Sequence, residues 1–202
     1  MRRGARGLWN VVLSGYPSSG KTLLAKRLVA EYQNFARVNV DELRSMFFDE
    51  PPPCRDEYAV YSLIGDIRDA LLKRKHSVVI DSTAPDRMTR EFLMATRARR
   101  VNQLLVVLGV DRKTLMERNV ARFGDAEMVF AWDKRWEEPL GECCLFKFGS
   151  SSLEEFENYY ALLAELLESE THPFRSEFRS LRRPLRDIRK GFRDFLSRLA
   201  FR

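Results

Sequence analysis

The sequence has few cysteines, few turn-forming residues and no long hydrophobic run. Cys54, Cys143 and Cys144 are too few and wrongly spaced for a disulfide framework or a zinc site. The longest apolar stretch, 104-LLVVLGV-110, is far shorter than the roughly 20 residues that cross a bilayer. No apolar segment of a signal peptide follows 1-MRRGARG-7. We therefore expect a cytoplasmic globular protein without transmembrane segments, and the sequence leaves its oligomeric state open.

Negative charge is scarce in one part of the chain. Residues 173–202 carry nine Arg and one Lys against three acidic residues, a net charge of +7. Because the whole chain carries +6, the remaining residues are nearly neutral at −1. The net positive charge therefore lies in the C-terminal segment, and it acts on whatever partner this segment contacts.

Apolar runs alternate with amphipathic stretches over the first three quarters of the chain. Strands are expected at 8–14, 35–39, 77–81, 103–110 and 143–148, and helices at 21–33, 41–47, 56–74, 86–99, 111–122 and 126–136. Alternating strands and helices predict an α/β fold with a parallel five-stranded sheet flanked by helices. The strands are apolar almost throughout, which suits a sheet covered on both faces.

Two further helical segments are expected after the sheet. Residues 151–170 predict an acidic helix, and Phe and Leu residues spaced by three and four between Phe174 and Leu199 predict a basic amphipathic helix broken near Pro184. We therefore divide the chain into a domain over 1–170 and a basic amphipathic helical extension over 171–202. Three roles for the extension stay open: binding an RNA or DNA backbone, packing on the acidic helix, or docking on an anionic membrane.

The segment 14-SGYPSSGKTLLAKRL-28 directly follows the first expected strand. Gly15 to Thr22 fit the G-x-x-x-x-G-K-[ST] spacing of a phosphate-binding loop. Gly15 and Gly20 let backbone N–H groups face phosphate oxygens, Lys21 places charge on the β and γ phosphates, and the Thr22 hydroxyl suits magnesium. The expected nucleotide contacts are Gly15, Ser18, Ser19, Gly20, Lys21, Thr22 and Leu23. A strand before the loop and a helix after it predict a site for a nucleoside triphosphate with Mg²⁺.

The sequence lacks features of some protein classes that contain such a loop, and these classes are excluded. A GTPase switch would carry D-x-x-G and N-K-x-D, and neither pattern occurs. A large mechanochemical ATPase normally needs a longer chain. The remaining class is a compact phosphotransferase, which needs a base for the acceptor hydroxyl, positive charge over the transferring group and closure against water.

A candidate base lies in 39-NVDELR-44, at the end of the second expected strand. Asp41 follows the carboxyl end of that strand, where open α/β sheets present groups to ligands. Arg44 falls on the same side of the first helical turn, where it either orients Asp41 or holds a phosphate of the acceptor. The alternative is that Asp41 only caps the helix.

Candidate charges and a candidate metal ligand lie in two later segments. Arg118 and Arg122 share one face of a helix in a lid expected at about 118–127, from which they close on the γ-phosphate; the alternative is a solvated helix end. Asp81 ends an apolar strand, in the arrangement of an acid near the magnesium ion. Thr83 with Asp86 resembles a capping box, so we expect Thr83 to cap the next helix.

Together these segments resemble the small P-loop kinases of the 5′-hydroxyl polynucleotide kinase and seryl-tRNA kinase-like group, over roughly residues 8–140. The matching patterns are 39-NVDELR-44, 118-RNVAR-122 and 80-IDST-83. The resemblance implies a P-loop NTPase fold with ATP and Mg²⁺ as cofactors. It implies that Asp41 is the general base with Arg44 beside it. It also implies that Arg122 is a γ-phosphate clamp and that Arg118 contacts the nucleotide.

The acceptor of the phosphate is less sharply indicated. The segment 135-RWEEPL-140 is more similar to the Glu-x-Pro segment of the seryl-tRNA kinase branch than to the phage-type enzyme. The leading hypothesis is a kinase whose acceptor is a polynucleotide 5′-hydroxyl or a tRNA-borne hydroxyl. Two alternatives stay open, a small-molecule kinase and a non-catalytic, nucleotide-gated accessory ATPase. The sequence does not distinguish ATP from GTP preference.

Overall fold

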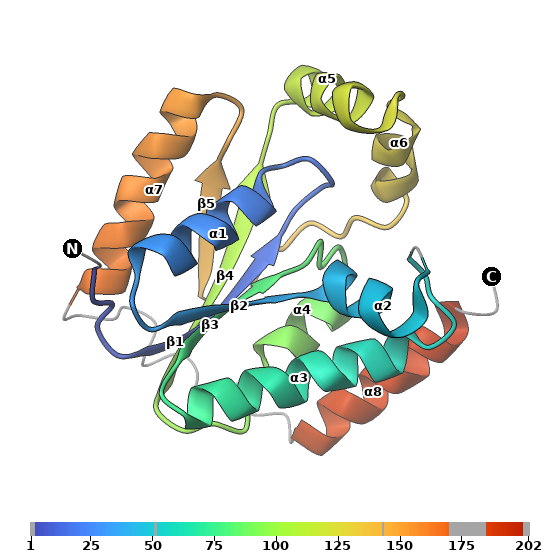
Figure 1. The fold of residues 1–202 in the computed structure, drawn as a ribbon. Helices are drawn as coiled ribbons and strands as arrows, with labels where there is room; N and C mark the ends of the chain where they lie inside the picture. The colour runs from blue at the N-terminus through green and yellow to red at the C-terminus, as the bar shows by residue number, and fades with distance from the viewer. Residues whose placement is uncertain (1–2, 51, 143, 170–184, 200–202) are drawn as a thin grey trace.

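One parallel sheet organises the chain, in the computed structural model that describes residues 3–50, 52–142, 144–169 and 185–199. Its strands are β1 Leu8–Ser14, β2 Phe35–Asn39, β3 Ser77–Asp81, β4 Val101–Gly109 and β5 Leu145–Gly149. They pair in the order β2-β3-β1-β4-β5, and every neighbouring pair is parallel (Figure 1). The predicted α/β class with a parallel five-stranded sheet is confirmed.

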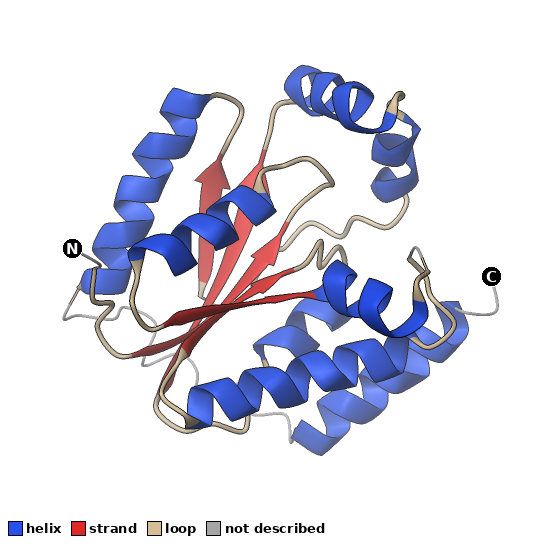
Figure 2. Ribbon diagram, in the orientation of Figure 1, coloured by secondary structure: helices blue, strands red, loops and turns tan. Residues whose placement is uncertain are grey.

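Helices cover both faces of this sheet (Figure 2). They are α1 Lys21–Glu31, α2 Val40–Phe48, α3 Glu57–Lys73, α4 Arg87–Met94, α5 Arg112–Phe123, α6 Glu127–Asp133, α7 Leu153–Glu168 and α8 Leu185–Leu199. Helices α1 and α7 pack on one face, whereas α3, α4 and α8 pack on the other. Within the described part of the chain, no helix combines the length and the apolarity needed to cross a membrane.

The central strand β1 divides the hydrophobic core into two halves. Trp9, Val11 and Leu13 belong to the half formed with α1 and α7, and Val12 belongs to the half formed with α3 and α4. All four side chains are fully buried. Because successive side chains of a strand point to opposite faces, the near-continuous apolar sequence of β1 serves both halves.

Expected boundaries are wrong around the connection from α4 to β4. The helix expected at 86–99 ends at Met94, and the strand expected at 103–110 begins at Val101. The buried Arg68 of α3 donates to the carbonyls of Leu93 (2.7 Å) and Ala95 (2.7 Å). The Arg68 guanidinium therefore supplies hydrogen-bond donors to carbonyl groups at the end of α4 that have no partner within the helix.

The last strand is also shifted from its expected position. The strand expected at 143–148 is β5, which begins at Leu145 and ends at Gly149. Its register pairs Leu105 with Leu145 and Gly109 with Gly149. Pairing with β4 therefore decides where this strand begins and ends.

The C-terminal helix α8 lies against α3 and α4, on the face of the sheet opposite α7 (Figure 1). Phe192 is fully buried, stacks on Phe92 at a centroid distance of 4.3 Å and meets Tyr61 edge-on at 5.2 Å. The alternative that the apolar stripe packs on the acidic helix is therefore wrong for the described part of α8, because the aromatic site that receives Phe192 lies between α3 and α4. Residues 171–184, with the predicted break near Pro184, lie outside the described residues, and the division at residue 170 stays a prediction.

Candidate functional site

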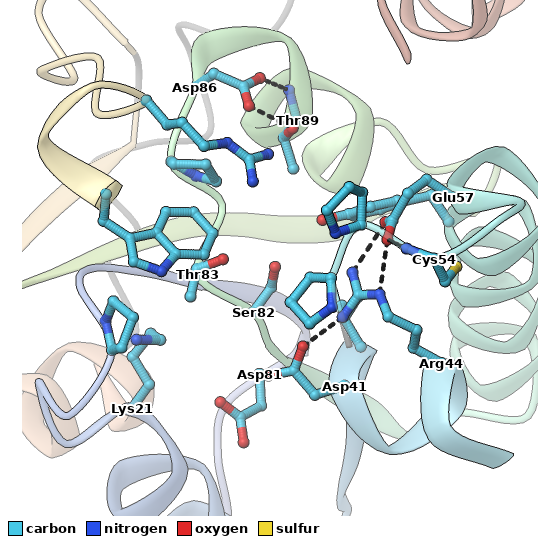
Figure 3. Close-up of a pocket in the computed structure, with 18 of the residues that line it drawn as sticks. Lys21, Asp41, Arg44, Cys54, Glu57, Asp81, Ser82, Thr83, Asp86 and Thr89 are labelled. Atoms are coloured by element: carbon cyan, nitrogen blue, oxygen red, sulfur yellow. Dashed lines mark hydrogen bonds and ion pairs between the residues drawn. The ribbon is translucent and has the colours of Figure 1, made fainter. Parts of the chain in front are cut away.

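A cavity of about 1090 Å³ lies at the carboxyl ends of the strands (Figure 3). Its walls come from the P-loop, from α2 and α3, from the turn after β3, from α5 and α6, and from the end of α8. Ligands of open α/β sheets bind in this position, beyond the carboxyl ends of parallel strands. The volume matches the upper end of small-ligand pockets, about 1,000 Å³, so the cavity has room for a nucleotide's phosphates and a second group.

Two glycines shape the loop between β1 and α1. At Gly15 (φ 151°) a Cβ would lie 2.9 Å from both the Leu108 carbonyl oxygen and Ser19 Oγ, so the position has no room for a side chain. Gly20 (φ 94°) is the N-cap of α1, and no side chain caps this helix. The first N–H groups of α1 therefore stay available to a ligand, as anion binding at a helix N-terminus requires.

Lys21 is held inside this loop. Its side chain Nζ donates to the carbonyls of Gly15 (2.9 Å) and Tyr16 (2.6 Å), and the residue is only 7% exposed. Burial lowers the pKa of Lys21 to about 8, although the Asp81 and Asp41 carboxylates raise it; the Arg122 guanidinium lowers it further. Two carboxylates and an arginine from three other segments therefore act on this ammonium group.

The remaining loop residues divide into those that line the cavity and those behind it. Ser18, Gly20, Lys21, Thr22 and Leu23 line the cavity. Ser19 is buried behind them, with its carbonyl accepting from Ser150 Oγ at 2.6 Å, and Gly15 is also outside the lining. The buried Ser18 Oγ has no hydrogen-bond partner among the described residues. An uncapped helix, a buried ammonium and an orphaned hydroxyl together fit the phosphates of a nucleotide.

Asp81 is fixed by two side chains of the neighbouring strand. Its Oδ2 accepts from Arg37 Nε (3.0 Å) and Nη2 (2.8 Å) and from Asn39 Nδ2 (2.8 Å). Asp81 and Thr22 both line the cavity, and their oxygens are of the kind that Mg²⁺ prefers. Sequence reasoning missed Arg37, although the alternation of side chains along β2 places residues 37 and 39 on one face.

Asp41 lies in the first turn of α2 and does not cap this helix. The cap is Asn39, whose Oδ1 accepts from the Glu42 N–H at 2.7 Å. The alternative that Asp41 merely starts the helix is therefore wrong. The Asp41 side chain is 72% exposed, lines the cavity and accepts a hydrogen bond from Arg44 Nη1.

Arg44 connects Asp41 to α3 (Figure 3). Its Nε and Nη2 donate to the two carboxylate oxygens of Glu57 at 2.7 and 2.9 Å, and Arg44 is 4% exposed. Burial alone would lower the pKa of Arg44, but Glu57 and Asp41 hold it above its usual value. For Glu57 the effect of burial is the opposite, since burial alone would raise the pKa of this carboxyl group. The hydrogen bonds from Arg44 instead keep the pKa of Glu57 below its usual value. Of the two roles considered for Arg44, this geometry favours orienting Asp41. Sequence reasoning missed Glu57, because nothing local in the sequence marks it.

The two arginines of α5 both line the cavity. Arg118 Nη2 donates to the Ser151 carbonyl at 3.1 Å, and the exposed Arg122 guanidinium lies 4.8 Å from the centre of the Phe123 ring. Asn119, fully buried between them, donates to the Pro17 carbonyl at 3.2 Å and so connects α5 to the P-loop. No role for Asn119 was predicted, although it stands inside the 118-RNVAR-122 pattern.

A second contact joins the P-loop to the segment after α5. The Tyr16 ring lies 5.0 Å from the Trp136 ring, and its hydroxyl donates to Asp133 Oδ1 at 2.9 Å. Arg112 pairs with the same carboxylate at 2.7 Å. Burial and the hydrogen bond to Asp133 raise the pKa of Tyr16 to about 12, so the hydroxyl stays a donor. Helix α5 and the segment of α6 and Trp136 therefore each contact the P-loop.

The turn after β3 differs from its expected role. The N-cap of α4 is Asp86, which accepts from the Thr89 N–H at 2.7 Å, so the expectation that Thr83 caps this helix is wrong. Thr83 instead lines the cavity, and its carbonyl accepts from the Gly15 N–H at 3.0 Å. The turn after β3 thus supports the P-loop.

Three solved structures illustrate the similarity of this fold. A gluconokinase from Sinorhizobium meliloti 1021 aligns with a TM-score of 0.60 and 21% identity, covering 81% of this chain and 95% of that chain. The Mycobacterium tuberculosis APS kinase in complex with AMPPNP and APS aligns with a TM-score of 0.61 and 18% identity, covering 81% and 99%. A chain of the Pnkp1/Rnl/Hen1 RNA repair complex aligns with a TM-score of 0.52 and 21% identity, covering 65% and 47%. At these identities the likeness establishes the fold alone.

Sequence comparison assigns the family. Among curated proteins no match to this chain is found. A family model described as an AAA domain matches residues 11–138, which include the P-loop, Asp41, Asp81 and both arginines of α5. Because this match spans more than half of the chain, the protein belongs to the AAA domain family, with a P-loop kinase-like fold.

Proposed function

We propose that this protein is an ATP-dependent phosphotransferase that moves the γ-phosphoryl group to a hydroxyl acceptor, a polynucleotide 5′-hydroxyl or a tRNA-borne hydroxyl. One observation carries the proposal. The exposed carboxylate of Asp41 lines the same cavity as Lys21 and Arg122, and both Asp41 and Arg122 affect the pKa of Lys21. A base, a phosphate-binding cation and a clamping cation thus lie around one space.

The residues of the chain divide the work of such a transfer. Lys21 and the N–H groups of the P-loop bind the β and γ phosphates, and Thr22 and Asp81 would hold Mg²⁺, which supplies charge neutralisation when bound. Asp41 accepts the proton of the acceptor hydroxyl while the oxygen of that hydroxyl forms a bond to the γ-phosphorus. The bond from that phosphorus to the β–γ bridging oxygen breaks, and a nucleoside diphosphate leaves. Arg122, with Arg118, balances the charge that develops on the transferring group.

Further lining residues support a nucleic-acid acceptor. Arg55 and Tyr58, just before and in the first turn of α3, and Trp132 and Arg135, in and after α6, all line the cavity. Arginines pair with phosphate groups, and aromatic rings stack on bases. These residues therefore suit the terminal nucleotide of a strand, in agreement with the resemblance to polynucleotide kinases.

Two other functions use the same fold and make different predictions. A small-molecule kinase, like the gluconokinase and APS kinase that share the fold, would show activity that is independent of residues 173–202 and nearly insensitive to salt. An accessory ATPase would keep nucleotide binding and its cellular role after Asp41→Asn. A small-molecule kinase would use the same base, whereas an accessory ATPase does not require the ion pairs that hold Asp41 through Arg44 and Glu57.

The proposal is tested with γ-labelled ATP and a panel of acceptors: 5′-hydroxyl RNA, 5′-hydroxyl DNA, charged tRNA and small metabolites. We expect label on a nucleic acid, with turnover reduced on the order of 10²-fold or more by Asp41→Asn and nucleotide affinity unchanged. Asp49→Asn is the matched control, because Asp49 ends the same helix outside the cavity lining. Label only on a metabolite, or free phosphate without a labelled acceptor, contradicts the proposal.

A further inference from the structure

A group of exposed cations lies at the amino ends of β3 and β4, at the edge of the sheet opposite the cavity. All of its members are exposed, and we call them the basic ridge: Lys73, Arg74, Lys75, Arg97, Arg99 and Arg100. None of them lines the cavity. The basic ridge is therefore a separate surface from the candidate active site.

Strand register brings the two parts of the basic ridge together. Asn10 of β1 pairs with Val78 of β3 on one side and with Gln103 of β4 on the other. Neighbouring strands lie about 4.8 Å apart, so the turns that lead into β3 and β4 are separated by about 10 Å. Both turns lie at the lower edge of the sheet in Figure 1, away from the P-loop.

The charge of the basic ridge is largely uncompensated. Arg97 pairs with Asp66 at 3.2 Å and lies 3.8 Å from Asp69. The other five cations form no ion pair with a carboxylate of the described residues. Arg189 of α8 also approaches Asp66, at 3.6 Å, which adds a further cation beside this surface. An acidic polymer would therefore meet several free positive charges.

Two of these cations hold backbone conformations that ordinary residues avoid. Lys75 has φ 69° and Arg100 has φ 59°. Glycine or asparagine fits this left-handed region with less strain than lysine or arginine. The chain thus places cations at two positions where the turn alone would favour a smaller residue.

We propose that the basic ridge binds the phosphate backbone of a polynucleotide, without reading its sequence. Large exposed hydrophobic side chains occur elsewhere on the described surface, but not in 73–76 or 95–100. Amphipathic membrane-binding segments combine cations with such apolar groups, and this surface offers cations alone, which favours a nucleic acid. The proposal does not depend on phosphate transfer, because it concerns binding at a surface remote from the cavity.

The test measures binding of the full-length protein to labelled, 5′-phosphorylated RNA and to DNA of the same sequence, without nucleotide. The probe accepts no phosphate at its 5′ end, so binding and phosphate transfer are judged separately. We expect the double variant Lys75→Gly/Arg100→Gly to melt at the same or a higher temperature, because the strain is relieved. At about 0.1 M salt its Kd should rise on the order of tenfold. The slope of log Kd against log salt concentration should fall by about 1.4, because each of the two lost phosphate contacts accounts for about 0.7 of that slope.

Two further variants keep the test decisive. Arg74→Ala/Arg99→Ala removes two unstrained cations of the same turns and should weaken binding similarly. Lys26→Ala/Lys147→Ala removes two exposed cations from α1 and β5 and should leave affinity unchanged. Binding to anionic phospholipid vesicles is measured in parallel. The proposal is overturned if the wild-type protein binds neither RNA nor DNA, if both ridge variants bind as tightly as wild type, or if the protein binds the vesicles but neither nucleic acid.

Discussion

Two parts of the cavity are built in different ways, and we name them after the proposed function: the nucleotide end at the P-loop and the acceptor end around Asp41. At the nucleotide end, Gly15 to Thr22 are consecutive residues, and Lys21 bonds to carbonyls within the same loop. At the acceptor end, Asp41 depends on Arg44, which depends on Glu57 of another helix. The first end is a local structure and the second is a tertiary one. Changes at the acceptor end should therefore spare nucleotide binding, whereas changes in the loop should damage both binding and transfer.

The largest effect is expected for Lys21→Ala. If Lys21 binds the β and γ phosphates as proposed, removing its ammonium group should reduce transfer by about 10³-fold and also weaken nucleotide binding. Turnover and nucleotide Kd, measured on the same preparation, check both parts. Lys26→Ala, on the exposed side of the same helix, is the control and should behave as wild type. Intact nucleotide binding in Lys21→Ala would remove the distinction between the two ends.

A smaller effect, confined to one end, is expected for Glu57→Gln. Without this carboxylate the buried Arg44 loses its bidentate partner and no longer holds Asp41 in position. Transfer should fall on the order of 10²-fold from the misplaced base, while nucleotide Kd stays unchanged. Glu165→Gln is the control, since Glu165 is an exposed carboxylate of α7 outside the cavity lining. Equal loss of nucleotide affinity would contradict a separate acceptor end.

The pKa of Lys21 predicts a moderate pH effect at the nucleotide end. Because burial lowers this pKa to about 8, nucleotide affinity should weaken above pH 8 by up to tenfold per pH unit. Lys21→Arg keeps its charge and should lack this loss, although its affinity is lower. Between about pH 8 and 10.5 the unfolded lysine binds more protons than the folded one, so stability without nucleotide should rise with pH. Calorimetric titration across this range measures the first effect, and thermal melting measures the second.

The smallest effect concerns acid stability at the acceptor end. The pKa of Glu57 is held below its usual value, so its ion pair with Arg44 contributes stability above the unfolded pKa of about 4.3. That contribution is lost as pH falls through the folded pKa. Glu57→Gln should therefore be less stable than wild type at neutral pH, with a difference that narrows in acid. A constant difference at every pH would mean that Glu57 acts by packing alone.

Local signals in the sequence predicted the parts of this protein that depend on neighbouring residues. The spacing from Gly15 to Thr22 identified the P-loop, and alternating apolar runs identified the parallel sheet and, within a few residues, its strands. These features follow from backbone sterics and from side-chain periodicity, which act over a few residues. The positions of Asp41 and Asp81 at the cavity follow from motifs at the carboxyl ends of strands, and those of Arg118 and Arg122 follow from the pattern expected for a lid helix.

Contacts between distant segments decided the rest. Arg68 bonds to carbonyls at the end of α4, which ends earlier than its periodicity indicates, and Glu57 holds Arg44 across two helices. Phe192 places α8 on α3 and α4, which brings the end of α8 to the cavity. Each of these depends on which buried polar group or ring finds a partner after the chain has folded. The amino-acid sequence by itself determined the nucleotide loop and the sheet, because their causes are local. Only the tertiary structure decided the surroundings of the candidate base and the gathering of the basic ridge, because both bring together residues far apart in the chain.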